Sequence, residues 1–226
     1  SRAVVPPIPG LNDAPYLTNE TLFDIDELPE HLIILGGGPI GMEMAQAFLR
    51  LGSRVTVIEM EKALGRADQG HARQAVAALT AEGVNILEGH KASKVSGGAG
   101  AITVSTQSEA GETVVTGSHL LLALGRTPNV EQLGLEEGGV SFNKAGIVTK
   151  DNLRSVSNSK VWAVGDIAGR GQFTHLAGWH ASIFVQGALM KLPAKAVTGA
   201  FPAVTYIQPE LAQVGMTEDE ARKTHG

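Results

Sequence analysis

The stretch from residue 32 to residue 59 alternates between short apolar runs, a glycine cluster and a helical apolar pattern. Residues 32–35 are all apolar, which is typical of a parallel strand covered on both faces. Residues 54–58 are rich in β-branched side chains and predict a second strand. Between them Gly52 is a natural helix stop, and it follows large apolar residues at helical spacing: Ile40, Met44, Phe48 and Leu51. The pattern predicts strand, glycine turn, helix and strand in succession.

The spacing of apolar residues changes in the next part of the chain, from a helical pattern to a strand-like alternation. Residues 69–81 predict a helix, with Asp68 as a candidate N-cap and Gly83 at its end. Residues 91–116 instead alternate between apolar and polar positions and are divided by glycine-containing turns, which predicts an antiparallel meander and not a crossover helix. Two apolar runs predict further parallel strands, at residues 84–87 and 119–124.

The last hundred residues contain shorter elements. A boundary is expected near Gly125, where the apolar run gives way to Gly-Arg-Thr-Pro-Asn. The capping-box pattern from Thr217 to Glu220 predicts the start of a helix. Between these points we expect strands and one helix, at residues 146–149 (strand), 161–164 (strand), 175–189 (helix) and 203–207 (strand).

Composition narrows the possible functions. With 226 residues the chain is long enough for one or two domains. The net charge of −5 and the lack of a basic run speak against nucleic acid as a partner. No apolar run reaches membrane-spanning length and no signal peptide is visible, so we expect a cytoplasmic protein without membrane partners. The absence of cysteine excludes disulfides, thiol chemistry and a zinc–thiolate site within this chain, and we expect no metal site.

The glycine cluster at residues 36–41, GGGPIG, fits G-x-G-x-x-G directly after the first strand. In such a turn Gly36 permits the tight bend, Gly38 lets a pyrophosphate approach the backbone, and Gly41 allows close helix packing. Pro39 suits the first helical position. Glu59 follows Gly38 by about 20 positions, the spacing of an acid that binds an adenosine ribose. The alternative is a glycine turn without a ligand, but the strand, helix and acid together predict a dinucleotide site.

With these blocks in place, the sequence resembles the pyridine nucleotide-disulfide oxidoreductases, the family of dihydrolipoamide dehydrogenase and mercuric reductase. Residues 36–43 match the NAD motif of that family, and ALGRTPN at 123–129 matches the end of its NAD domain. VWAVGDIA at 161–168 matches its second FAD motif, and residues 201–221 match the opening of its dimerisation domain. The first G-x-G-x-x-G, the Cys-x4-Cys pair and the C-terminal His-Glu pair of the family have no counterpart in these residues.

The resemblance implies an α/β fold and a division into domains. We expect a Rossmann-like NAD-binding domain with a parallel sheet, flanking helices and a β-meander, together with partial FAD-domain and dimerisation-domain segments. The chain is expected to be an internal fragment that is inactive when isolated. The implied boundaries are 1–28 (linker from the FAD domain), 29–124 (NAD-binding domain), 125–195 (second, incomplete FAD segment) and 196–226 (truncated start of the dimerisation domain).

The resemblance also implies the roles of particular residues toward NAD. Glu59 would accept from the adenosine ribose, and its charge together with the following Met-Glu-Lys favours NADH over NADPH. Glu43 would lie near the nicotinamide carboxamide, although a solvated helix residue is the alternative. Ala92 would lie near the adenine and Gly125 at the nicotinamide end. The pyrophosphate would be held by the glycine turn: Gly36, Gly38, Pro39, Ile40 and Gly41.

Other residues match the FAD site of the family. Asp166 would bind the ribityl or diphosphate part of FAD, and Phe173, Thr174 and His175 match a segment beside the flavin. Taken alone, His175 is more often a satisfied residue at a helix start. No catalytic residue is expected in this chain, because His225 lies in the wrong block for the catalytic histidine of the family.

The function implied for the intact protein is hydride transfer between NADH and FAD, coupled to a redox disulfide, in a homodimer. Three further readings stay open: a mercuric-reductase-like enzyme, a relative of the NADH oxidase or transhydrogenase type, and a non-catalytic NAD-binding module. The substrate cannot be read from this sequence.

Overall fold

A computed structural model describes residues 1–196 and 199–226, which divide into two compact units. The larger unit contains Ala3–Gly125, Val204–Gln213 and Thr217–Gly226, and the smaller contains Ser1–Arg2, Arg126–Ala203 and Val214–Met216. One division falls directly after Gly125, where the sequence predicts a boundary. The assignment of the segments to NAD, FAD and dimerisation domains stays a prediction.

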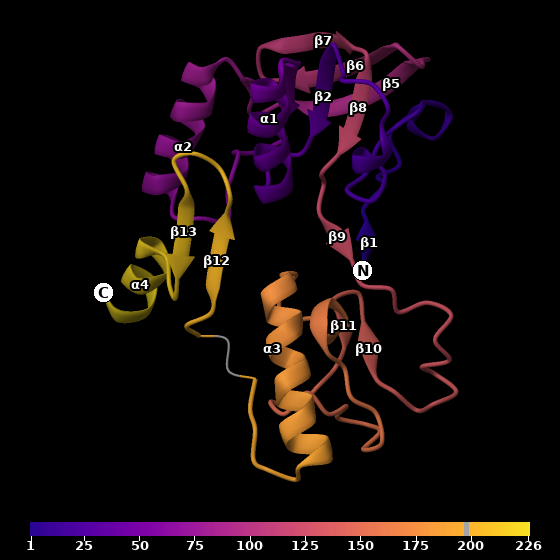
Figure 1. Cartoon of the computed structure of the whole chain (residues 1–226), viewed down its shortest axis with the longest axis vertical. Coiled ribbons are helices and arrows are strands. Elements are labelled where there is room, and N and C mark those ends of the chain that lie inside the picture. The colour runs from indigo at the N-terminus through magenta and orange to yellow at the C-terminus, as the bar shows by residue number, and fades with distance from the viewer. Residues whose placement is uncertain (197–198) are drawn as a thin grey trace. The chain divides into compact units, whose positions relative to one another are not determined.

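A four-stranded parallel sheet forms the centre of the larger unit (Figure 1). Its strands lie in the order β4-β3-β2-β8, so their carboxyl ends meet at one edge. The predicted parallel strands are confirmed, although β8 ends two residues before the predicted end. Their bounds are His31–Leu35 (β2), Arg54–Ile58 (β3), Asn85–Leu87 (β4) and His119–Leu122 (β8).

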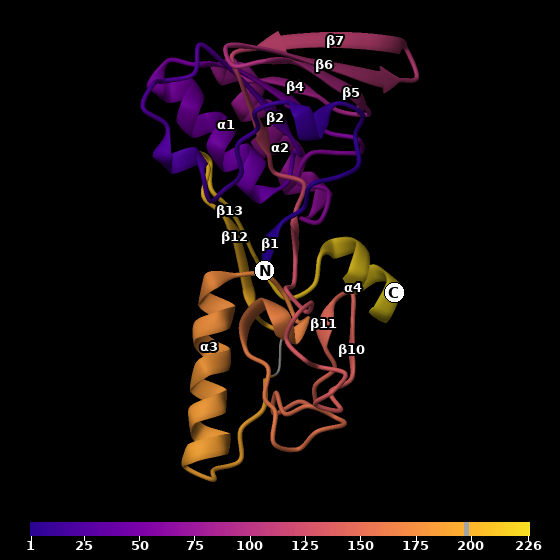
Figure 2. The same cartoon turned by 90° about the vertical axis from the view of Figure 1, so that its right-hand side faces the viewer.

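The two faces of the sheet have different covers (Figure 2). Leu32 and Ile34 of β2 pack in one core with the helices α1 and α2, whereas Ile33 and Leu35 pack in a second core with the antiparallel meander. Successive side chains of a strand point to opposite faces, which explains the uninterrupted apolar run. The covering elements are α1 (Pro39–Leu51), α2 (Gln69–Glu82), β5 (Lys91–Gly98), β6 (Ala101–Ser108) and β7 (Gly111–Gly117).

The helix α1 forms where its apolar spacing predicts, but its buried face is rotated from that spacing. Met42, Ala45 and Phe48 are buried, whereas Ile40 is 36% exposed and Leu51 is 65% exposed. Ile40 lies in the first turn, directly before the buried Gly41 and Met42. The large apolar residue at the start of α1 is therefore available at the surface.

Residues 204–213 and 217–226 dock on the helices of the larger unit, although the sequence assigns them to a separate domain. The buried amide of Gln46 in α1 donates to the carbonyl oxygen of Gln208 (2.8 Å) and accepts from its N–H (2.7 Å). Ile207 and Leu211 belong to the same core as α1 and α2. The elements concerned are β12 (Pro202–Thr205), which pairs with β13 (Leu211–Val214), and α4 (Glu218–His225).

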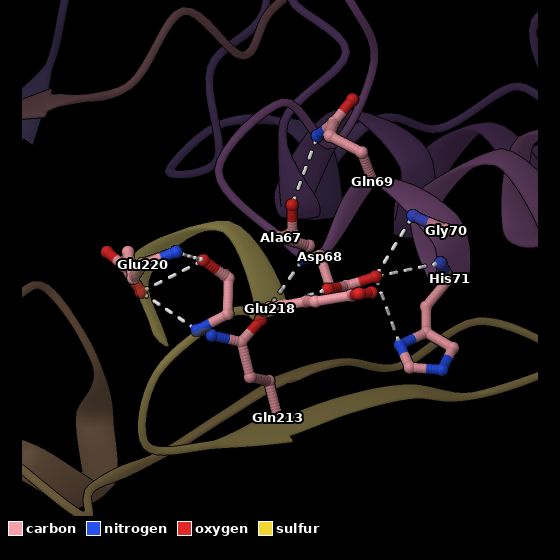
Figure 3. A network of polar contacts seen from close by, with 9 residues as sticks. Ala67, Asp68, Gln69, Gly70, His71, Gln213, Glu218 and Glu220 are labelled. Carbon is pink, nitrogen blue, oxygen red and sulfur yellow. Dashed lines mark hydrogen bonds and ion pairs between the residues drawn. The ribbon is translucent and has the colours of Figure 1, made fainter. Parts of the chain in front are cut away.

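Asp68 links two helix starts in this region (Figure 3). Its carboxylate accepts from the N–H of Gly70 at the start of α2 and from the N–H of Glu218 at the start of α4. These bonds hold the pKa of Asp68 below its usual value, with the bond from Glu218 as the largest cause. The predicted cap of α2 and the predicted capping box of Thr217 and Glu220 are both confirmed.

The smaller unit has little regular sheet. Its short elements are β10 (Phe142–Asn143), which pairs antiparallel with β11 (Gly146–Ile147), η3 (Gly165–Ala168), α3 (Thr174–Phe184) and the π-helical turn η4 (Val185–Leu189). The remaining short elements of the chain are β1 (Arg2–Ala3), η1 (Leu11–Asp13), η2 (Leu22–Asp24) and β9 (Arg126–Thr127).

The strand predicted at residues 161–164 is wrong. Trp162 makes one isolated bridge with Arg154, and the stretch continues into η3 instead of a ladder. Three of its four apolar side chains are accounted for by packing, because Ala163 is buried in the core of the unit and Val161 and Trp162 pack against that core. Val164 is 39% exposed. An apolar run of this length predicts burial but does not by itself specify a strand partner.

Candidate nucleotide-binding site

Two glycines of the turn between β2 and α1 are required by the packing of the chain itself. Gly36 has a φ of 107°, and an added Cβ would lie 2.4 Å from the carbonyl oxygen of Ala123. At Gly41 an added Cβ would lie 2.0 Å from the carbonyl oxygen of Gly36. Both distances are far below van der Waals contact, so these positions hold the turn tightly against β8 and α1.

Gly38 is different, because nothing in the chain requires a glycine there. Its φ of −74° is ordinary, and no atom lies within 4 Å of an added Cβ. It is the N-cap of α1, and no side chain caps this helix start. Pro39 occupies the first helical position, as predicted. The first turn of a helix has backbone amides without intrahelical partners, so an uncapped helix start with open space at Gly38 is suited to an anion such as a pyrophosphate.

Glu59 lies beside this turn at the carboxyl end of β3. Its Oε2 accepts from the N–H of Gly37 at 2.7 Å, and its Oε1 accepts from the N–H of Glu61 at 2.9 Å. A carboxylate has about four acceptor positions, so both oxygens retain capacity for hydroxyl donors. The structure therefore brings the predicted acid and the predicted glycine turn into direct contact.

The other residues predicted to contact NAD lie elsewhere in the larger unit. Glu43 in α1 accepts from the N–H of Tyr206 at 2.8 Å, so it is not merely a solvated helix residue. Gly125 has a φ of 95°, and no atom lies within 4 Å of an added Cβ. Ala92 in β5 pairs with Thr106 and packs against the second core. Their predicted contacts with the nicotinamide and adenine stay predictions.

The residues predicted to contact FAD lie in the smaller unit. Asp166 in η3 accepts from the hydroxyl of Ser1 and lies 3.8 Å from the guanidinium of Arg126. This partly exposed carboxylate is chemically suited to accept hydroxyl groups of a cofactor. The contacts around it also give Arg126 a role that the sequence did not indicate, because Arg126 donates to the Ser1 hydroxyl at 2.7 Å.

The segment that opens α3 carries the remaining predicted FAD contacts. Phe173 is the N-cap residue and Thr174 is the first helical residue. The imidazole of His175 stacks on Phe201, with ring centres 4.9 Å apart and planes 4° apart, and its Nε2 lies 2.9 Å from the carbonyl oxygen of Pro202. His175 is therefore held in place at the helix start, as expected of a satisfied residue there, and its predicted contact with a flavin stays a prediction.

His180 is a buried polar residue that the sequence reasoning missed. It is fully buried in α3, and its Nδ1 accepts from the N–H of Gly165 at 3.1 Å, directly before Asp166. The proton therefore lies on Nε2, which is buried and has no hydrogen-bond partner among the described residues. Burial and the nearby charge of Arg170 lower the pKa of His180. The available signal was its position four residues after Leu176, because residues at this spacing lie on the same face of a helix.

We expect the stability of the smaller unit to fall as the pH drops below about 6.5, the pKa of an unfolded histidine. In that range the His180 imidazole is protonated in the unfolded chain but stays neutral in the folded chain, because its folded pKa is lowered. The unfolding free energy therefore falls by at most about 1.4 kcal/mol per pH unit. His180→Gln should remove this slope while keeping an acceptor for Gly165. Urea unfolding followed by tryptophan fluorescence measures it, because both tryptophans lie in this unit. Equal slopes in the two proteins would contradict the assignment.

The helices and the acidic and histidine side chains of the described part of the chain bear on membrane spans and metal sites. None of its helices has the length and apolar character needed to cross a membrane. Within the same residues, no group of three or more His, Cys, Asp or Glu side chains is placed to hold a metal ion.

The family model for pyridine nucleotide-disulphide oxidoreductases matches residues 1–181. The chain belongs to this family. Its curated relatives include mercuric reductases, for example that of Acidithiobacillus ferrooxidans, which is 35% identical over 222 residues covering 97% of this chain and 39% of the relative. The mercuric reductase of Staphylococcus aureus is 32% identical over 220 residues, covering 97% of this chain and 40% of the relative.

Solved structures of the family share the fold. The Cu(II) complex of the HOCl-induced flavoprotein disulfide reductase RclA from Escherichia coli is 32% identical, with a TM-score of 0.88 over 98% of this chain and 51% of that chain. LpdA from Mycobacterium tuberculosis is 27% identical, with a TM-score of 0.82 over 92% of this chain and 45% of that chain. The chain thus spans about half the length of these solved relatives, which include a flavoprotein disulfide reductase.

Proposed function

We propose that the larger unit binds NADH at the carboxyl edge of its parallel sheet. The observation that carries the proposal is Gly38, where an added Cβ would meet no atom of the chain within 4 Å, at an uncapped helix start. A glycine that the fold does not require is explained by a ligand that approaches the backbone. The family name includes a pyridine nucleotide, and such a ligand has a pyrophosphate of the right charge.

The roles of the chain in this proposal are binding and orientation. The turn at residues 36–41 holds the pyrophosphate through backbone N–H groups, and the exposed side chain of Ile40 lies in the same turn. Glu59, fixed by Gly37 and Glu61, accepts from the adenosine ribose hydroxyls and repels a 2′-phosphate. These groups place the nucleotide along one edge of the sheet, and they distinguish NADH from NADPH at its adenosine end.

For the intact protein we propose hydride transfer between NADH and FAD, in a cytoplasmic homodimer. The bound cofactors would supply the redox chemistry, and Asp166 would hold FAD hydroxyl groups. The family match and the flavoprotein relatives support this proposal. Segments outside this sequence decide whether the intact protein is a mercuric-reductase-like enzyme, a relative of the NADH oxidase or transhydrogenase type, or a non-catalytic NAD-binding module.

The proposal predicts that the full 226-residue chain binds NADH more tightly than NADPH. Titration calorimetry with each nucleotide measures both dissociation constants. Glu59→Ala should reduce the ratio of NADH to NADPH affinity about tenfold or more, because a hydrogen bond to a charged group contributes about 1.5–3 kcal/mol. The substitution should weaken the binding of NADH and relieve the repulsion of the NADPH 2′-phosphate.

Glu112→Ala provides a matched control. Glu112 is exposed on β7 of the same unit and belongs neither to the glycine turn nor to the loop after β3, so its loss removes the same charge without removing a group of the proposed site. Equal or tighter binding of NADPH by the unsubstituted chain would overturn the assignment of Glu59. If Glu112→Ala narrowed the preference as much as Glu59→Ala, general charge would be the cause.

A further inference from the structure

The loop that follows β3 contains features of a phosphate receptor. Residues 60–66 include two exposed cations, Lys62 and Arg66, directly after Glu59. In dinucleotide folds a basic residue near this acid accommodates the 2′-phosphate of NADP. The loop of this chain therefore carries positive charge in the region where NADPH would have to be excluded.

The backbone of this loop is nevertheless tied to the protein at three N–H groups. Glu61 donates to Oε1 of Glu59 at 2.9 Å, and Leu64 donates to the carbonyl oxygen of Gly37 at 2.8 Å. Between them, Ala63 donates to Oε1 of Glu88 at 2.7 Å. Glu88 directly follows the neighbouring strand β4, so it joins a second strand to the loop.

The two partners of the Ala63–Glu88 bond are themselves held. Ala63 and Leu64 are buried at 2% and 3% exposure, and Leu64 has the left-handed φ of 55°. On the other side, the turn after β4 is bonded to the loop through its backbone: Gly89 donates to the carbonyl oxygen of Glu61 (3.0 Å), and His90 donates to that of Glu59 (2.9 Å). The carboxylate of Glu88 therefore meets a fixed amide from a fixed turn.

We propose that Glu88 is a specificity-determining residue, which excludes NADPH by occupying the amide of Ala63. This inference rests on the proposed NADH site. A 2′-phosphate entering the loop needs N–H donors as well as cations, and binding Ala63 would require it to displace a carboxylate. NADH carries no 2′-phosphate, so its binding leaves the bond between Ala63 and Glu88 intact. Glu59 contacts the ribose, whereas Glu88 acts through the loop.

Two substitutions separate the acceptor from the charge. Glu88→Ala removes both, whereas Glu88→Gln removes the charge and keeps an oxygen that accepts from Ala63. Because a net hydrogen bond is worth about 1 kcal/mol, Glu88→Ala should narrow the NADH/NADPH affinity ratio about fivefold, mainly through tighter NADPH binding. Glu88→Gln should change the ratio by less than about twofold, since a single exposed charge contributes little.

The experiment is titration of the full chain and both variants with NADH and NADPH, together with amide exchange of Ala63 by NMR. Faster exchange in Glu88→Ala, but not in Glu88→Gln, is expected. If both variants narrowed the NADH/NADPH affinity ratio equally, the loss of charge and not the release of the Ala63 amide would be the cause. That result would overturn the inference. An unchanged ratio in both, with NADH still bound, would overturn it while leaving the proposed function standing. Failure of the unsubstituted chain to bind NADH would overturn both.

Discussion

Gly36→Ala is expected to lower the unfolding free energy of the larger unit by about 3 kcal/mol or more. An alanine there must adopt a φ near 107° or move the backbone, and its methyl group would lie 2.4 Å from the carbonyl oxygen of Ala123. Ala123 itself donates its N–H to Leu35, so the obstructing carbonyl belongs to a fixed segment after β8. Neither β2 nor β8 can retreat without disturbing the register between them.

Urea unfolding followed by far-UV circular dichroism measures this effect. Gly98→Ala is the matched control, because Gly98 ends β5 in the same unit and no atom lies within 4 Å of an added Cβ. We expect the control to change the unfolding free energy by less than about 0.5 kcal/mol. If Gly36→Ala were as stable as the control, the tight contact between the turn and Ala123 would be wrong.

Gly38→Ala should have the opposite profile: a nearly unchanged fold and a large loss of nucleotide binding. The methyl group meets no atom of the chain, and alanine at an N-cap is less favourable than glycine by only about 0.5–1 kcal/mol. The methyl group does occupy the space through which a pyrophosphate would reach the backbone amides. We expect the dissociation constant for NADH to rise on the order of 100-fold, which corresponds to about 2.7 kcal/mol.

Calorimetric titration with NADH, combined with the urea experiment on the same variant, tests both halves of this expectation. A dissociation constant within about threefold of the unsubstituted chain would mean that the nucleotide does not approach Gly38. A large loss of stability would mean that the position has a structural role that the present contacts do not reveal. The pair of variants thus distinguishes a glycine kept for the fold from a glycine kept for a ligand.

The elements of the larger unit were predictable because their signals are local. The apolar run of β2, the glycine turn, the cap at Asp68 and the stop at Gly83 each depend on residues within a few positions of one another. The distance from Gly38 to Glu59 is also a local quantity, since one helix and one strand span it. The sequence therefore placed the acid beside the turn correctly.

The contacts that the sequence did not indicate join residues far apart in the chain. From the sequence Gln46 is an ordinary helix residue and Glu88 an ordinary turn residue. The structure shows that Gln46 bonds to Gln208 and that Glu88 accepts from the N–H of Ala63. Burial of His180 depends on the path of Gly165 in the same way. The wrong strand prediction at residues 161–164 has a related cause. A strand requires a neighbouring strand to pair with, and an apolar run does not indicate whether one is present.

The docking of residues 204–213 on α1 has a consequence for the time course of folding. The amide of Gln46 and the backbone of Gln208 are separated by 162 positions, and Ile207 and Leu211 complete the core that α1 and α2 begin. At ribosomal rates of about 5–20 residues per second, a nascent α1 waits roughly 10–30 s for these partners. During that interval one edge of the first core stays uncovered, while Arg126–Ala203, the main segment of the smaller unit, is synthesised between α1 and residues 204–213.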